Sequence, residues 1–293
     1  MTEPRPPLHR RLRHARRRPR YAGPSFNRLV PNILTMLGLC CGLTALRFAL
    51  DGRWEKAAAL IVVAVAIDGI DGRIARLLKA TSRFGAEFDS LSDFLCFGVA
   101  PALILFMWSL HDARGWGFAP CILFAVCSAL RLARFNASID EAPALALTGP
   151  PPKPAFAQNF FTGVPAPAGA GLALFPLFLW LAAEDWGWPG LAGLARHGVL
   201  VAVTLAVVGV LMISTLPTWS FKNFKVPAAL VLPLLIGVGA FGAALLTEPW
   251  AALAGGGLFY ASMLFFSARS YVRLKREAEA NLMPVVVAGR EAG

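Results

Sequence analysis

The sequence has few charged residues. Asp, Glu, Lys and Arg make up only 15% of its 293 residues, whereas about a quarter of a typical soluble domain is charged. Hydrophobic residues make up 57%, and many lie in runs that approach or reach the roughly 20 residues a helix needs to cross a bilayer. This composition argues against a soluble globular enzyme and predicts an all-α, polytopic transmembrane helical bundle.

Cysteine and histidine are scarce as well. The five cysteines lie inside apolar stretches, with no CxxC pair and no histidine at a metal-binding spacing. The four histidines fall in the predicted tails and outer loops. Disulfide bonds and structural zinc are therefore not expected, and we interpret the cysteines as small buried apolar residues.

Eight hydrophobic segments predict about eight membrane spans. They cover residues 29–50, 54–78, 91–110, 116–135, 166–183, 198–216, 226–246 and 250–268. Residues 1–28 hold nine arginines and little apolar content, which predicts a disordered basic tail. Residues 29–270 then form the transmembrane catalytic domain, and residues 271–293 form a second tail. Six spans would also leave both tails on the same side of the membrane.

Positive charge is distributed unevenly over this topology. With the amino terminus in the cytoplasm, 23 of the 28 Lys and Arg residues lie in the tails and cytoplasmic connections, and five lie outside. Such a bias is typical of cytoplasmic loops, so both termini are expected in the cytoplasm. Topology and membrane lipids then explain the net charge of +11, and no nucleic-acid partner is expected.

Four aspartates interrupt the second and third segments near their predicted cytoplasmic ends. Asp68 and Asp71 are three residues apart, and Asp89 and Asp93 are four apart, so each pair lies on one face of its helix. The connection between the helices, residues 79–85, is short enough to make them antiparallel neighbours. The four carboxylates are therefore expected in one pocket, although an aspartate at mid-membrane costs about 2.5–3.5 kcal/mol on insertion scales.

Clustered carboxylates need a compensating charge. Oxygen ligands without histidine or cysteine favour Mg²⁺ or Mn²⁺ over Zn²⁺, and two such ions suit a site that handles phosphoryl oxygens. A structural ion pair between Asp71 and Arg73 or Arg76 is the simpler interpretation, but it leaves three acids unexplained. The small residues Gly72 and Gly85 leave room for a nucleotide base or a diphosphate near the backbone.

The acids belong to a longer signature. From residue 68 the chain reads DGIDGRIAR, then eight further residues, then GAEFDSLSD up to residue 93. This stretch fits D-x2-D-G-x2-A-R-x8-G-x3-D-x3-D, the pattern of the CDP-alcohol phosphotransferases, at every position, so the chain resembles that family. Further stretches are similar to its membrane-embedded phosphatidylserine synthase branch: VPNILT from residue 30, RLARFN from residue 131 and FTGVPAP from residue 161.

The resemblance implies a reaction and a site. The reaction is transfer of the phosphatidyl group from CDP-diacylglycerol to L-serine, with CMP released. Asp68, Asp71, Asp89 and Asp93 would bind two divalent ions, and Asp93 would also act as general base. The implied CDP-binding residues are Gly72, Ala75, Arg76, Gly85, Asn32 and Thr35. The resemblance further implies a homodimer in a prokaryotic inner membrane, with the active site near the cytoplasmic face.

Three basic residues are candidates for binding the carboxylate of serine or the transferred phosphate. Arg131 and Arg134 lie at the predicted cytoplasmic end of the fourth segment, where an arginine fork suits a carboxylate. Lys222 lies in a later cytoplasmic connection. A purely topological role, in which the side chains reach for the membrane surface, explains the two arginines equally well.

Two alternatives remain open. A relative with the same chemistry would use glycerol 3-phosphate or inositol phosphate, but a phosphorylated acceptor calls for a denser basic cluster than Arg131, Arg134 and Lys153 provide. A divalent-metal transporter would need acids on several helices, yet the apolar centres of the last four segments contain none. Direct in-line transfer is expected, because no Ser, Cys or His of the signature is placed as a nucleophile.

Overall fold

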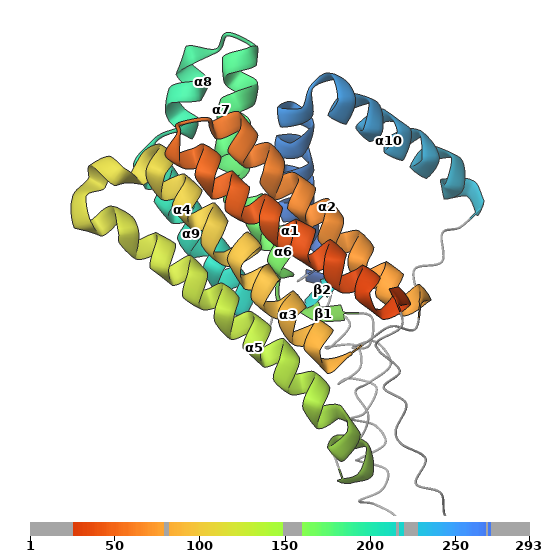
Figure 1. Cartoon of the computed structure of the whole chain (residues 1–293). Helices are drawn as coiled ribbons and strands as arrows, with labels where there is room; N and C mark the ends of the chain where they lie inside the picture. Colours follow the sequence, from red (N-terminus) through yellow and green to blue (C-terminus); the bar gives the residue numbers. More distant parts are fainter. Residues whose placement is uncertain are drawn as a thin grey trace, which may run out of the picture.

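The computed structural model describes residues 26–78, 82–148, 160–214, 217–219, 228–267 and 269–270. Helices dominate this part of the chain and pack side by side into a bundle (Figure 1). The α-helices are α1 (Phe26–Leu50), α2 (Trp54–Leu77), α3 (Arg83–Asp93), α4 (Ala100–Leu105), α5 (Ala119–Thr148), α6 (Ala166–Ala173), α7 (Phe175–Asp185), α8 (Pro189–Ala195), α9 (Gly198–Ile213) and α10 (Ala228–Thr247). One more helix, here called the Pro249 helix, covers Pro249–Ser267.

Helical turns of other pitch join several of these elements. Two π-helical segments, η2 (Phe94–Val99) and η3 (Phe106–Leu110), flank α4, and the 3₁₀-helix η4 (His111–Phe118) leads into α5. Together α3, η2, α4, η3 and the start of η4 form one continuous helical rod over Arg83–Ala113. The pair of aspartates on α3 therefore stands at one end of a long membrane-spanning element.

Small residues let α1 approach its neighbours closely. Gly38, Gly42, Ala45 and Ala49 recur every three or four residues and are all buried, so they form one face of α1. A Cβ atom on Gly42 would lie only 2.5 Å from the Sγ atom of Cys96, so glycine is needed where α1 contacts η2. Such close backbone packing holds helices together in lipid, where burial from water contributes little.

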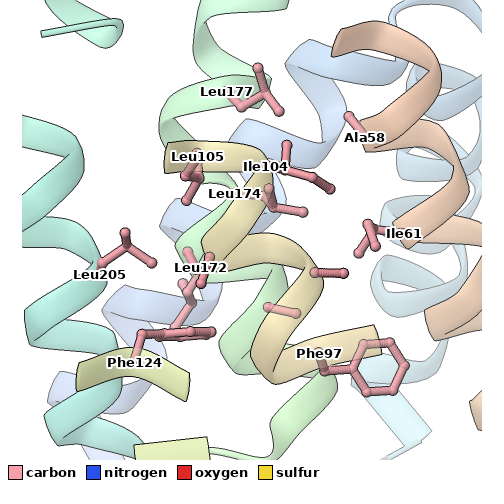
Figure 2. Close-up of a cluster of buried hydrophobic side chains, with 14 of the residues drawn as sticks. Ala58, Ile61, Phe97, Ile104, Leu105, Phe124, Leu172, Leu174, Leu177 and Leu205 are labelled. Atoms are coloured by element: carbon pink, nitrogen blue, oxygen red, sulfur yellow. The ribbon is translucent and has the colours of Figure 1, made fainter. Parts of the chain in front are cut away.

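The hydrophobic core lies between α2, α4, α5, α6, α7 and α9. In Figure 2, Ile61 of α2, Ile104 of α4, Leu174 between α6 and α7, and Leu205 of α9 point into this common space, and each of the four is at most 1% exposed. Phe124 of α5 and Leu172 of α6 belong to the same buried cluster. The core thus fixes the helices that carry the aspartates against those on the far side of the bundle.

The all-α bundle is confirmed, but the spans differ from the eight predicted ones. Within the described residues, five helices are long and apolar enough to cross a membrane, or seven if each of two bent pairs is one span. The predicted span that is not among them is α2, which has 24 residues but carries charged side chains near both ends. One bent pair is α6 and α7, which meet at 44°; Pro176, at the start of α7, offers no N–H for a continuous helix.

Two connections that were predicted as loops pair with each other. Strand β1 (Phe160–Thr162) runs antiparallel to β2 (Pro217–Trp219), with Phe161 opposite Thr218. Helix α5 continues to Thr148, well beyond the predicted end at residue 135. Of the predicted tails, residues 1–25 and 271–293 lie outside the described residues, and residues 26–28 already belong to α1.

Candidate metal and substrate site

The first pair of aspartates extends the buried face of α2. Ala57, Ile61 and Ala64 are buried, and Asp68 and Asp71 follow at the same three- and four-residue spacing. Asp71 is only 5% exposed. The helix face that packs into the apolar core at one end therefore carries carboxylates at the other.

The second pair comes from α3. The Oγ atom of Ser82 accepts a hydrogen bond from the backbone N–H of Gly85 at 3.0 Å, which caps the start of this helix. Asp89 and Asp93 follow one turn apart, both half-buried, and the buried Cys96 continues their face. Helix α1 contacts both α2 and α3, and its residues Thr35 and Gly38 line the pocket together with the two acidic faces.

The carboxylates converge. One oxygen atom from each of Asp68, Asp71 and Asp89 lies within 4.8 Å of the other two. Asp93 lies within hydrogen-bonding reach of Asp68, and its side chain lines the same pocket. The four acids thus meet as their spacing predicts, and three of them are close enough to share one ion.

The pocket that holds them is small. It encloses about 10 Å³, roughly the space of one water molecule. Its lining residues are Thr35, Gly38, Ala64, Ile67, Asp68, Asp71, Asp89, Ser92, Asp93, Cys96 and Phe97. A small cation fits this space, whereas a nucleotide would have to lie at the opening.

The donor set suits a hard divalent cation. Carboxylate oxygens are the ligands that Mg²⁺ and Mn²⁺ prefer, and neither histidine nor a cysteine thiolate is required. Among the residues that the structure describes, no arginine or lysine forms an ion pair with the four aspartates. Arg73 and Arg76 are exposed, so the simpler interpretation, an ion pair with Asp71, is not observed.

Thr35 ties α1 to this cluster. Its hydroxyl lies 3.0 Å from Oδ2 of Asp71 and 3.1 Å from the carbonyl oxygen of Pro31, so its single proton can be donated to either. Ser92 and Cys96 point their polar atoms at α1 as well, toward the carbonyl oxygens of Thr35 and Gly38, at 3.5 Å each. These contacts hold the acidic faces of α2 and α3 against α1.

The other residues implied in CDP binding lie around the cluster. Gly72 and Arg76 are exposed on α2, Ala75 is half-buried, and a Cβ atom on Gly72 would meet nothing within 4 Å. Gly85, in contrast, is closely packed: a Cβ there would lie 2.9 Å from Oδ1 of Asn32. Gly85 thus brings the start of α3 against α1, and its role toward a nucleotide stays a prediction.

The three basic candidates separate in the structure. Arg131 is half-buried and interacts electrostatically with Asp93, and its Nε atom is buried without a hydrogen-bond partner. Arg134 is exposed, and its Nη1 atom donates to the carbonyl oxygen of Ile213 at 3.4 Å. Lys222 lies outside the described residues. Of the two described candidates, Arg131 is therefore the one that interacts electrostatically with the acidic cluster.

Sequence reasoning missed two polar contacts at this end of the bundle. Tyr260 of the Pro249 helix is half-buried and interacts electrostatically with Arg131. The side-chain amide of Asn136 donates to the Oγ atom of Ser90 at 2.9 Å and so joins α5 to α3. A lone tyrosine in an apolar span carries no sequence signal, whereas Asn136 already stands in the RLARFN stretch.

Comparisons with known proteins point to one family. A family model described as CDP-alcohol phosphatidyltransferase matches residues 28–208, which include the four aspartates, and a second, described as CDP-alcohol phosphatidyltransferase 2, matches residues 229–264.

Curated relatives agree with the family match. The chain is 36% identical over 222 residues to a CDP-diacylglycerol–serine O-phosphatidyltransferase of Mycobacterium tuberculosis, an alignment that covers 76% of this chain and 72% of that protein. A protein of the same description from Helicobacter pylori is 34% identical over 208 residues, 71% of this chain and 79% of its own. A third, from Bacillus subtilis, is 32% identical over 114 residues, 39% of this chain and 64% of its own.

Proposed function

The chain belongs to the CDP-alcohol phosphatidyltransferase family, and we propose that within it the protein transfers the phosphatidyl group of CDP-diacylglycerol to L-serine. The products are phosphatidylserine and CMP. The observation that carries this proposal is the convergence of three carboxylate oxygens within 4.8 Å, next to a fourth acid, at one end of a membrane bundle. The names of the relatives support the choice of serine.

Asp68, Asp71 and Asp89, together with Asp93, are the residues that would hold two divalent ions, Mg²⁺ or Mn²⁺. Their all-oxygen donor set fits such ions. When bound, the ions supply positive charge that offsets the anionic oxygens of the diphosphate. Without that charge, four carboxylates this close would repel one another and the substrate.

Asp93 is proposed as the general base. The Oγ atom of serine forms a bond to the phosphorus that carries diacylglycerol, the bond from this phosphorus to the oxygen of CMP breaks, and the hydroxyl proton passes to Asp93. A positioned carboxylate can accept a proton in this way, and contact with Asp68 orients it. CMP leaves with the bonding electron pair.

Direct transfer is supported by the state of the other polar side chains in the pocket. Thr35, Ser92 and Cys96 are the hydroxyl and thiol residues that line it, and the Thr35 hydroxyl is held between Asp71 and the carbonyl oxygen of Pro31. Ser92 and Cys96 direct their polar atoms toward carbonyl oxygens of α1, so none of the three is free to attack phosphorus. A covalent enzyme intermediate would need such a nucleophile beside a base.

The substrates are proposed to meet at the opening of the pocket. The exposed Gly72 and Arg76, with Ala75, offer the nucleotide a surface on α2, while Asn32, Thr35 and Gly85 border it from α1 and α3. Arg131 would hold the carboxylate of serine, because it interacts electrostatically with Asp93 and its buried Nε has no hydrogen-bond partner. The acyl chains stay in the bilayer.

We further propose the setting of the enzyme. Both termini lie in the cytoplasm, the active site is near the cytoplasmic face of a prokaryotic inner membrane, and two copies form a homodimer. The charge distribution over the connections supports the orientation, and the resemblance supports the dimer.

An acceptor assay tests the proposed function. The purified protein in detergent, with CDP-diacylglycerol and Mg²⁺ or Mn²⁺, is expected to release CMP with serine but not with glycerol 3-phosphate or inositol phosphate. Excess chelator should stop the release. CMP release with a phosphorylated acceptor alone would contradict the serine proposal, and activity in excess chelator would contradict the metal site.

A further inference from the structure

A large apolar groove opens between α6, α7, α9 and the Pro249 helix. Its volume is about 590 Å³. It is lined by Leu172, Phe175, Val203, Thr204, Val207, Val208, Leu211, Gly257, Leu258, Ala261, Leu264 and Phe265. Helix α6 contacts both η2 and α9, and the groove shares no lining residue with the acidic pocket. No residue of α1, α2 or α3 lines the groove.

The lining offers almost nothing polar. Thr204 has the single polar side chain among the lining residues, and its hydroxyl already donates to the carbonyl oxygen of Leu200 at 2.9 Å. A cavity without free hydrogen-bonding groups holds water poorly, because a water molecule needs two to four polar partners. Hydrocarbon chains are the apolar molecules that surround such a groove within a membrane.

The groove is about one leaflet deep. On α9 it extends from Val203 to Leu211, and on the Pro249 helix from Gly257 to Phe265. Eight residues of helix rise about 12 Å, which is close to half of the roughly 30 Å of bilayer hydrocarbon. A chain in this groove would therefore belong to one leaflet only.

Positive charge marks the end of the groove at the membrane surface. The guanidinium of Arg269 lies 4.3 Å from the centre of the Phe265 ring, and Phe265 lines the groove. This end is on the aspartate side, because Arg134 of α5 reaches Ile213 at the end of α9, and Asn136 of the same helix reaches Ser90 beside Asp89. Arginine at this position suits a phosphate group.

We propose that this groove binds one acyl chain of an anionic glycerophospholipid from the leaflet on the aspartate side, with the lipid phosphate beside Arg269. The bound lipid is distinct from the reacting lipid, since the groove and the acidic pocket share no lining residue. The site goes beyond the proposed reaction and does not depend on which alcohol the enzyme uses.

Lipid retention tests the groove. Val207 lines it, whereas Val210 on the same helix does not, and the two side chains are similarly exposed, at 51% and 57%. Native mass spectrometry of the purified wild-type protein is expected to show one retained phospholipid. Val207→Trp should fill the groove and lower this retention at least tenfold, while the control Val210→Trp should retain the lipid. Equal retention in the two variants would overturn the proposal.

A second measurement tests the headgroup without any groove-filling variant. The wild-type protein, stripped of lipid in detergent, is titrated with dioleoyl phosphatidylglycerol or with dioleoyl phosphatidylcholine. We expect at least tenfold tighter binding of the anionic lipid and loss of this preference in Arg269→Ala. Failure to bind either lipid would overturn the site. The proposal would also be overturned if a second copy of the chain occupied the groove instead of a lipid, which would be seen as a dimer that Val207→Trp dissociates. Neither experiment contains serine or CDP-diacylglycerol, so its failure leaves the proposed reaction untouched.

Discussion

At the level of single residues, Asp93 has the most specific proposed role, because it is both a metal ligand and the general base. Asp93→Asn keeps the shape of the side chain but removes its capacity to accept a proton. We expect a loss of roughly 10²–10⁴-fold in the rate of CMP release, the usual range for general base catalysis. Glu87→Gln is the matched control, since Glu87 lies on the same helix, is exposed and does not line the pocket. Equal rates for Asp93→Asn and the control would refute the general-base role.

The metal site makes a prediction about stability that is independent of turnover. Binding to the folded state stabilises a protein by about 2.7 kcal/mol when the ligand is at a hundred times its Kd, so Mg²⁺ should raise the melting temperature of the wild-type protein. Asp68→Asn removes one of the three converging carboxylates and should reduce this rise. Without divalent ions the variant should be at least as stable as wild type, because one repulsive charge is gone. A rise of the same size in both proteins would argue against the site.

Two arginines on α5 provide another pair for comparison. Arg131 interacts with Asp93 and has an unpaired Nε atom, whereas Arg134 is directed at the end of α9. Arg131→Ala is expected to raise the KM for serine at least tenfold, and Arg134→Ala should change it little. Initial rates of CMP release at varied serine concentration measure both values. The reverse order would return Arg131 to a purely topological role.

At the level of whole elements, the sequence predicts the two acidic helices well because their signal is local. The three- and four-residue spacings of the aspartates hold in α2 and α3, and both helices pack against α1 rather than mainly against each other, which still brings their carboxylates together. The interaction of Tyr260 with Arg131 was not predictable, because it joins two helices that are far apart along the chain. The bends between α6 and α7 and between α8 and α9 were not predictable either. Hydropathy does not distinguish a straight apolar helix from two shorter helices that meet at a bend within one span.

The contact between α1 and η2 gives an element-scale prediction. Gly42→Ala places a methyl group 2.5 Å from the Sγ atom of Cys96, and overpacking of this kind costs about 1–3 kcal/mol. The melting temperature in detergent should fall, and activity should fall with it, because Cys96 is less than one turn from Asp93. The control Gly237→Ala lies in α10 with nothing within 4 Å, so its helix should gain about 0.5–1 kcal/mol. A higher melting temperature for Gly42→Ala would contradict the close packing.

At the scale of the whole molecule, the fold combines a tight core with an outlying helix. The described residues of α1 to α9 contribute most of the buried core, while α10 leans away from the bundle (Figure 1), and none of its most apolar stretch is buried. In a bilayer such a helix is surrounded by lipid or by a second copy of the chain, and composition alone does not distinguish these cases. Its position relative to the bundle was therefore beyond what hydropathy predicts.

The orientation of the bundle in the membrane is the property on which the substrate supply depends. The proposed reaction takes serine from the cytoplasm, which requires the connection between α2 and α3 to lie inside and that between η3 and α5 to lie outside. Arg83 is exposed at the connection between α2 and α3, and Asp112 is exposed at the connection between η3 and α5. In a background where the five cysteines are replaced, Asp112→Cys should react with a membrane-impermeant maleimide in right-side-out vesicles, and Arg83→Cys only in inside-out vesicles. The opposite labelling would place the aspartates at the outer face. Cytoplasmic serine could not then reach them, and most Lys and Arg residues would lie outside, against the usual charge bias.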